Sequence, residues 1–281
     1  MKRRDRKSVL NIVKAVYPML LYLLIIQVTA IIIALVYVVA IGRGSLNNLA
    51  EVLSKYSLFI NLCSAAVMLP VLLIIKYFDS KDQKSKGVKG YKRVNPLLYI
   101  FIVPFSIAFM FAANYLVSFM EKIFPFMAHS YDQVAETIYS SNIFVQIVYV
   151  IFLGPIVEEL IFRGVLYTRL KRMFGLWAAA ITASVLFGIF HGNISQGIYA
   201  FLFSMALIFV YEKYKKIEAP IIFHMVGNSM GVLVTYLAKD YNNQSEGSVP
   251  IFSLIILITV FSLISLGLGS CISKWVKPQK R

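Results

Sequence analysis

The sequence predicts an all-α, polytopic integral membrane protein of about eight transmembrane helices. Apolar residues make up 59% of the 281 residues and charged residues only 15%. Soluble globular domains average about 45–50% apolar and about 25% charged residues. Uncharged stretches of about 20 residues or more, the length that crosses a bilayer as a helix, recur along the chain. This composition also excludes a disordered, collagen-like or disulfide-rich secreted chain.

Each uncharged stretch is expected to form one span. The stretches are 15–42, 56–75, 94–120, 137–157, 173–211, 219–238 and 247–273. The first is too long for the apolar region of a signal peptide and is interpreted as an uncleaved span. The fourth has to continue through three charged residues to about Thr168, and the fifth is long enough to break into two helices at 191–197. Between the third and fourth, 121–142 is expected to be a short interfacial helix or a loop.

The net charge of +15 is best explained by orientation in the membrane. If the spans alternate from a cytoplasmic N-terminus, 23 of the 28 Lys and Arg residues lie on the cytoplasmic side and four on the other side. This asymmetry predicts a multi-pass cell-membrane protein with both termini in the cytoplasm. The basic segment 76–93 is either a solvated loop or a contact for anionic membrane lipids. No motif indicates a nucleic-acid partner.

Three charged residues, Glu158, Glu159 and Arg163, lie well inside a predicted span. Charges within a membrane are costly and suggest function. Glu159 and Arg163 are four residues apart and are expected to pair on one helix face. Glu158 is about 100° further round the helix and is free to point elsewhere. The pair alone is more often structural than catalytic.

Two of the three histidines complete the candidate site. Phe187 lies one turn before His191 and is expected to brace its ring. His224 and Asn228 share a face of the seventh span. If the fourth and fifth spans form a hairpin near Gly175, His191 lies level with the glutamates. A lone membrane histidine is more often a helix–helix hydrogen-bonding residue, but the whole set points to a functional site that holds a water or a metal ion.

Small residues flank both histidines as GxxxG pairs, Gly188/Gly192 and Gly227/Gly231. These pairs either let neighbouring helices approach closely or are the ordinary glycines of membrane spans. Gly154-Pro155 precedes the glutamates and either widens the helix near them or is an ordinary proline of a span.

Three motifs carry a family resemblance. Glu158-Glu-Leu-Ile-Phe-Arg163 reads as EExxxR, Phe187-Gly-Ile-Phe-His191 as FxxxH, and His224-Met-Val-Gly-Asn228 as HxxxN. In this order on consecutive membrane segments, they resemble the CPBP intramembrane proteases, also called the CAAX-protease and bacteriocin-processing (Abi) family. The matching region runs from about residue 140 to 235.

The resemblance implies an eight-helix fold, with the site between helices 4, 5 and 7, that hydrolyses peptide bonds. Glu158 and His191 would activate a water, His224 and Asn228 would stabilise the oxyanion, and Glu159 and Arg163 would orient the site. A Zn²⁺ ion held by Glu158, His191 and His224 would use the same residues. The sequence lacks the zinc-binding motif HExxH, and the family resemblance does not decide between the two mechanisms. The cofactor is therefore either none or Zn²⁺.

The expected partners are a peptide or a lipidated protein as substrate, in CAAX-type or bacteriocin-related processing or self-immunity. A non-catalytic membrane immunity or accessory protein and a small-solute transporter are the alternatives that use the same bundle. Transporters often contain inverted repeats, and none is evident in this sequence. The expected division is 1–135 for the first three helices, 136–240 for the catalytic core and 241–281 for the last helix and basic tail.

Overall fold

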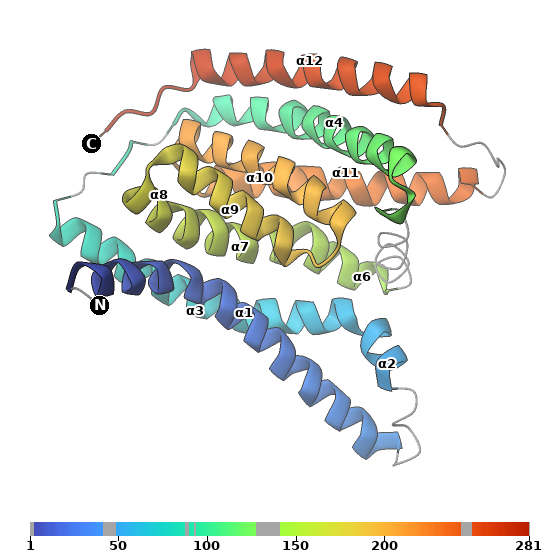
Figure 1. The fold of residues 1–281 in the computed structure, drawn as a ribbon, viewed down its shortest axis with the longest axis horizontal. Helices are drawn as coiled ribbons and strands as arrows, with labels where there is room; N and C mark the ends of the chain where they lie inside the picture. Colours follow the sequence, from blue (N-terminus) through green and yellow to red (C-terminus); the bar gives the residue numbers. More distant parts are fainter. Residues whose placement is uncertain are drawn as a thin grey trace. The chain divides into compact units, whose positions relative to one another are not determined.

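The structure of the chain is a computed structural model. It describes residues 3–41, 49–87, 90–92, 94–127, 141–242 and 249–280. Regular structure in these residues is helical, apart from one isolated antiparallel bridge between Tyr91 and Lys280 (Figure 1). The predicted all-α class is therefore confirmed.

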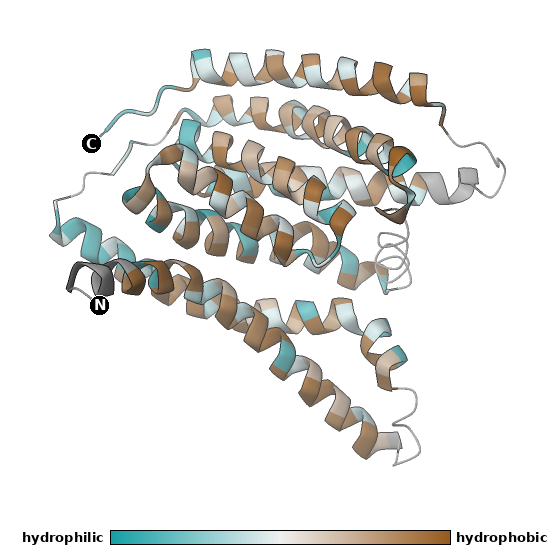
Figure 2. Cartoon of the chain, in the orientation of Figure 1, coloured by the Kyte–Doolittle hydropathy of each residue, from teal (hydrophilic) through white to brown (hydrophobic). Residues whose placement is uncertain are grey.

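Seven helices among the described residues are long and apolar enough to cross a bilayer. They are Val9–Ala40, Ser57–Ser85, Pro96–Ile123, Ile143–Phe174, Ile194–Tyr214, Glu218–Leu237 and Ile251–Trp275. The remaining predicted span is α9 (Leu176–Phe190), which is apolar but has only 15 residues. At 1.5 Å per residue it covers about 22 Å of a hydrocarbon core of about 30 Å. The polytopic membrane class is confirmed, with seven full-length helices and one short one (Figure 2).

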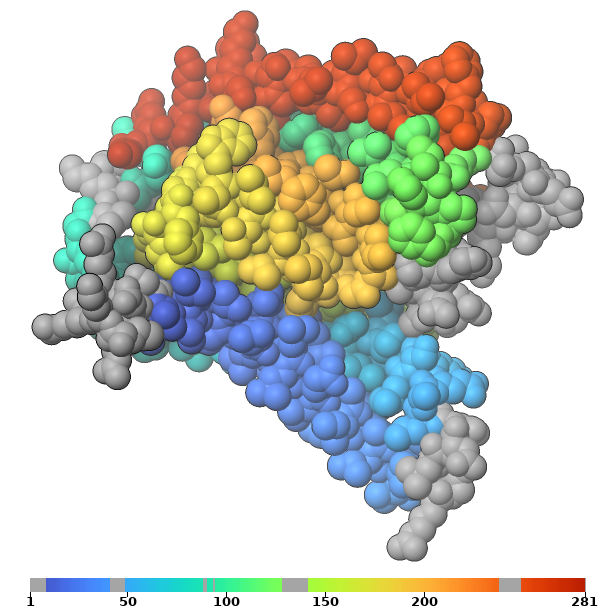
Figure 3. All heavy atoms as spheres, viewed as in Figure 1, coloured from blue at the N-terminus to red at the C-terminus, as the bar shows by residue number. Residues whose placement is uncertain are grey.

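Contacts divide the chain into two units, which are described separately. The first comprises 1–87 and 133–179. Its helices are α1 (Arg3–Ile41), α2 (Leu49–Lys55), α3 (Ser57–Ser85), and the long helix over 143–174. Helix α1 packs along α3 and against the second half of the long helix. Many apolar side chains of α1, whose atoms are the darker blue spheres in Figure 3, are exposed, as a lipid-facing helix requires.

The long helix of the first unit changes its winding four times. It consists of α6 (Ile143–Gln146), the π-helix η4 (Ile147–Leu153), α7 (Gly154–Glu159), the π-helix η5 (Leu160–Tyr167) and α8 (Thr168–Phe174). A Cβ at Gly154 would lie 2.8 Å from the Tyr149 carbonyl oxygen, so the wide turn that ends η4 requires glycine there. The widening expected near Gly154-Pro155 is confirmed on both sides of α7. Such wide turns are frequent at functional sites.

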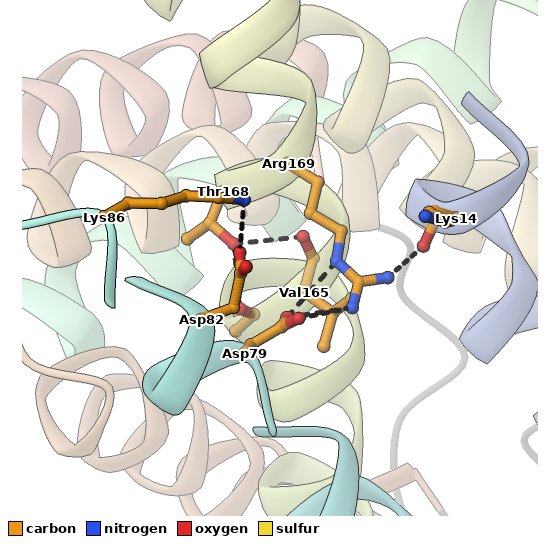
Figure 4. Close-up of polar contacts among 8 residues, drawn as sticks. Lys14, Asp79, Asp82, Lys86, Val165, Thr168 and Arg169 are labelled. Carbon is orange, nitrogen blue, oxygen red and sulfur yellow. Dashed lines mark hydrogen bonds and ion pairs between the residues drawn. The ribbon is translucent and has the colours of Figure 1, made fainter. Parts of the chain in front are cut away.

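Arg169 joins three helices of the first unit (Figure 4). Its Nη2 lies 2.8 Å from Oδ1 of Asp79 on α3, and its Nε donates to Oδ2 of the same carboxylate at 3.2 Å. Nη1 donates to the backbone carbonyl of Lys14 on α1. A bidentate arginine–carboxylate pair has a fixed geometry, so α8 is held against α1 and α3 at this end of the unit.

The second unit comprises 88–132 and 180–281. It contains η2 (Pro96–Phe101), α4 (Ile102–Ile123), η3 (Pro125–Met127), most of α9, α10 (Ile194–Tyr214), α11 (Glu218–Asn242) and α12 (Ile251–Trp275). Helix α4 contacts α10, α11 and α12 (Figure 1). Its Phe105 stacks edge-to-face on Phe223 of α11 at 5.2 Å, and Phe223 contacts Phe203 of α10 at 5.1 Å. These aromatic contacts form the core of the unit.

The predicted break after the fifth span is confirmed. Helix α9 ends at Phe190, and Gly192 has a φ of +78°, a left-handed conformation that glycine adopts without strain. The Asn193 side chain then caps α10 by accepting a hydrogen bond from the Gln196 N–H at 2.8 Å. Most of the segment predicted over 121–142 as an interfacial helix or loop, residues 128–140, lies outside the described residues.

Candidate functional site

The two adjacent glutamates occupy different environments in the first unit. Glu159 is fully buried, and its Oε1 accepts a hydrogen bond from Nη1 of the buried Arg163 at 2.8 Å. This is the ion pair that the i,i+4 spacing predicts. Glu158 is only half-buried. One carboxylate is therefore neutralised inside the protein, and the adjacent one retains access to its surroundings.

His191 is held in one orientation by Phe187 in the second unit. Its Nδ1 lies 2.7 Å from the Phe187 carbonyl oxygen, and the two rings meet edge-to-face at 4.8 Å. A carbonyl oxygen can only accept, so Nδ1 carries the hydrogen of this bond. In the neutral imidazole the lone pair is then on Nε2, which can accept a proton or bind a metal ion.

His224 packs against the same phenyl ring. Its ring lies edge-to-face with Phe187 at 6.0 Å and with Phe203 at 5.6 Å, and it is 4% exposed. The second unit therefore gathers both candidate histidines around Phe187. Asn228 is half-buried one turn further along α11, on the face that bears His224.

A hydrogen bond that sequence reasoning missed fixes α11 immediately before His224. The Ser106 hydroxyl on α4 donates to the Phe223 carbonyl at 2.6 Å, and both side chains are fully buried. Serine is common in membrane helices, so nothing in the sequence marks Ser106 as a support for this histidine.

One glycine of each GxxxG pair makes a close contact. A Cβ at Gly188 would lie 2.6 Å from the Gly197 carbonyl oxygen of α10, and one at Gly227 would lie 2.5 Å from the Phe203 ring. A Cβ at Gly192 or Gly231 would meet nothing within 4 Å. The packing interpretation is confirmed for Gly188 and Gly227 and is wrong for their partners.

A groove of about 490 Å³ follows the turn that bears His191. It lies within the second unit, between α9 and α10, and its walls are almost entirely apolar. Its lining residues are Val185, Gly188, Ile189, Gly192, Asn193, Ile194, Gly197, Ile198 and Phe201. An apolar side chain or an acyl chain next to His191 fits this lining.

The predicted site residues are divided between the two units. Glu158, Glu159 and Arg163 belong to the first, whereas Phe187, His191, His224 and Asn228 belong to the second. The predicted level placement of Glu158 and His191 remains a prediction. Within the described part of either unit, no three His, Cys, Asp or Glu side chains form a metal-ligating group.

Two tyrosines that the sequence did not single out lie near Glu158. The side chains of Tyr22 on α1 and Tyr149 on η4 are within electrostatic reach of this carboxylate and of each other. The chain has 17 tyrosines, and no spacing in the sequence distinguishes these two. Only the packing of α1 against the long helix indicates them.

Comparison with known proteins assigns the segment that carries the motifs. Residues 140–230 match the family described as Type II CAAX prenyl endopeptidase Rce1-like. A Bacillus subtilis (strain 168) protein named "Putative membrane peptidase YdiL" is 31% identical over 81 residues, which are 29% of this chain and 33% of that protein.

The chain therefore matches about a third of that relative's length. No solved structure matches the chain. All three motifs, from Glu158 to Asn228, fall inside residues 140–230. Through this segment, the chain is similar to the Rce1-like CAAX endopeptidases, in agreement with the resemblance to the CPBP family.

Proposed function

We propose that this protein is an intramembrane endopeptidase that hydrolyses a peptide bond of a membrane-associated peptide or lipidated protein. The observation that carries the proposal is that all six polar motif residues lie within the segment matched by an endopeptidase family. The substrate class follows from that family and from the apolar groove next to His191. CAAX-type processing and bacteriocin-related processing or self-immunity are the two settings proposed for the reaction.

Glu158 and His191 would act on the water. Glu158 is the half-buried member of the glutamate pair, and His191 has its lone pair on Nε2 in the neutral form. Together they would remove a proton from water as it attacks the scissile carbonyl. Glu159 and Arg163 would hold the helix turn that bears Glu158 through their buried ion pair.

His224 and Asn228 would stabilise the oxyanion that forms on the carbonyl. Both can donate hydrogen bonds from one face of α11, and His224 is held by Phe187 and Phe203. Donors placed in a water-poor site contribute about 3–4 kcal/mol each to transition-state stabilisation.

Zn²⁺ is the alternative way to activate the water. Glu158, His191 and His224 offer the nitrogen and oxygen donors that zinc uses, and a bound zinc would lower the pKa of its water. Neither unit by itself gathers three such ligands among its described residues, so no step is assigned to a metal here.

Cleavage of fluorogenic peptides, with and without a lipid anchor, by the purified full chain in lipid nanodiscs tests the proposal. Glu158→Gln and His191→Ala are each expected to lower kcat/KM about 100-fold or more, because each removes a proton acceptor. His224→Ala and Asn228→Ala are each expected to lower it by about 100- to 1,000-fold. Glu51→Gln, an exposed carboxylate on α2, serves as the matched control.

Full activity in Glu158→Gln would contradict the proposed mechanism. Activity that survives excess chelator, with no metal detected in the protein, would contradict the zinc alternative. The same purified protein can also be reconstituted in liposomes. Solute uptake by these liposomes, together with no cleavage of any peptide, would favour a transporter instead.

A further inference from the structure

Two tyrosines, Tyr22 and Tyr149, are placed to orient the carboxylate of Glu158. The inference rests on the proposed function for its catalytic consequence, but the contact itself can be tested without any activity. All three residues belong to the first unit, so the argument depends on that unit alone.

Tyr22 lies on the buried stripe of α1 with Ala15 and Met19 and, unlike them, carries a hydroxyl. Many apolar side chains of α1 are exposed, for example Leu20 at 54% and Leu24 at 58%, but Tyr22 is 0% exposed. Burying a hydroxyl away from water is unfavourable unless it has a polar partner. A phenylalanine would fill the same space without this cost. The buried hydroxyl is thus expected to serve a polar neighbour on the long helix against which α1 packs.

The Tyr149 ring lies against Gly154, one helical turn before Glu158. A Cβ added at Gly154 would be 3.4 Å from ring atom Cε2 and 3.5 Å from Cζ, the atom that bears the hydroxyl. Gly154 and Glu158 are four residues apart on α7 and share a helix face. The Tyr149 hydroxyl is therefore presented on the face of α7 that carries the Glu158 carboxylate.

The two glutamates differ in their hydrogen-bonding neighbours, although the charge of Arg163 acts on both. Tyr22 and Tyr149 both interact with the charge of Glu158 and with each other. Glu159 makes the buried hydrogen bond with Arg163 instead. Arg163 thus restrains one carboxylate, and the tyrosines lie near the other.

We propose that the hydroxyls of Tyr22 and Tyr149 form a hydrogen-bonded pair that donates to Glu158 and fixes its carboxylate in the orientation required to act on water. Both are positioning residues, because they act through Glu158 and not on the substrate. Glycine at position 154 is consistent with this role, because a Cβ there would lie 2.8 Å from the Tyr149 carbonyl oxygen and would shift the backbone that carries this tyrosine.

Infrared difference spectroscopy of the lipid-reconstituted full chain tests the contact directly. Subtracting the spectrum of Glu158→Gln from that of the parent isolates the carboxyl bands of residue 158. For each tyrosine variant, the spectrum of the same variant carrying Glu158→Gln is subtracted in the same way. The bands are expected to shift in Tyr22→Phe and Tyr149→Phe, and further in the double variant. The matched control is Tyr37→Phe, because Tyr37 lies about 22 Å further along α1 than Tyr22. This variant should leave the carboxyl bands of residue 158 unchanged. Unchanged bands in the folded single variants would overturn the inference.

Kinetics test the positioning role. Each Tyr→Phe change is expected to lower kcat about 10- to 100-fold with KM unchanged, because misplacing a reacting group affects the chemical step. In the Glu158→Gln background the same changes should cause no further loss. An equal loss in both backgrounds would show a general structural effect and overturn the role. If the parent cleaves nothing, the proposed function fails, and the infrared result still decides the contact.

Discussion

At the scale of single residues, the charged side chains of the long helix occupy two different environments. Glu159 and Arg163 form a fully buried pair at 2.8 Å, whereas Glu158 remains half-buried one residue away. A buried pair contributes little net stability, because desolvation offsets the attraction, but removing one partner leaves an uncompensated charge. The fold is therefore expected to depend on both members of the pair. Glu158 is the glutamate of the two that is accessible for the proposed reaction.

The buried pair predicts a large and asymmetric effect on stability. Arg163→Met is expected to lower the free energy of unfolding by about 3–5 kcal/mol, because Glu159 is left charged in an apolar interior. The double variant Glu159→Leu/Arg163→Met should recover most of this loss. Unfolding in mixed micelles with increasing sodium dodecyl sulfate measures both changes.

The matched control for the buried pair is Asp82→Asn. Asp82 and Lys86 are also four residues apart, with Nζ–Oδ2 at 2.6 Å, but their side chains are 52% and 68% exposed. Exposed pairs contribute about 0–1 kcal/mol, so this variant should unfold almost as the parent does. Equal destabilisation by Arg163→Met and Asp82→Asn would contradict the assigned role of burial.

At the scale of helices, backbone geometry decides where the site residues lie. The wide turns on either side of α7, the left-handed Gly192 after α9 and the close approach at Gly227 each set the position of a candidate residue. The sequence pattern located the glycines. It could not tell which of them touch a neighbour, because that depends on the crossing of helices distant in sequence.

The contact at Gly227 predicts different outcomes for two glycines on one helix. Gly227→Ala is expected to destabilise the protein by about 1–3 kcal/mol, since its Cβ would lie 2.5 Å from the Phe203 ring that packs on His224. Gly231→Ala, where nothing lies within 4 Å, should be neutral or slightly stabilising. Unfolding midpoints of the two variants in the same detergent measure the difference, and equal midpoints would contradict the packing at Gly227.

At the scale of the whole molecule, the distribution of charge predicts how the chain is oriented in the membrane. The cytoplasmic assignment of both termini rests on 23 of the 28 basic residues falling on one side. Seven helices are long enough to cross the bilayer, and α9 is short. The orientation is therefore a prediction from charge, and both termini lie on one side only if the short helix α9 also crosses the bilayer.

Reporter fusions in a bacterial inner membrane test this orientation. Green fluorescent protein fused after residue 281 is expected to fluoresce, because the charge distribution predicts a cytoplasmic C-terminus. Alkaline phosphatase fused after Pro125, between the third and fourth spans, should be active because the predicted orientation places this position outside the cytoplasm. Active phosphatase at the C-terminus, or fluorescence from a fusion after Pro125, would contradict the predicted orientation.

The sequence by itself determined the membrane class, the spans and the candidate residues. Hydrophobic length and charge placement are local properties, so they could be counted directly. The Glu159–Arg163 pair and the Phe187–His191 contact were also predictable, because residues four apart on a helix must lie on one face.

Only the tertiary structure decided which residues from distant segments meet. It placed His224 on Phe187, tied α11 to α4 through Ser106, and brought Tyr22 and Tyr149 near Glu158. The physical reason is that most of these contacts join residues separated by tens to more than a hundred positions, and that Tyr149 and Glu158 are separated by a change in helical winding. Such contacts follow from how whole helices pack, and the helical period of one segment contains no information about its neighbour.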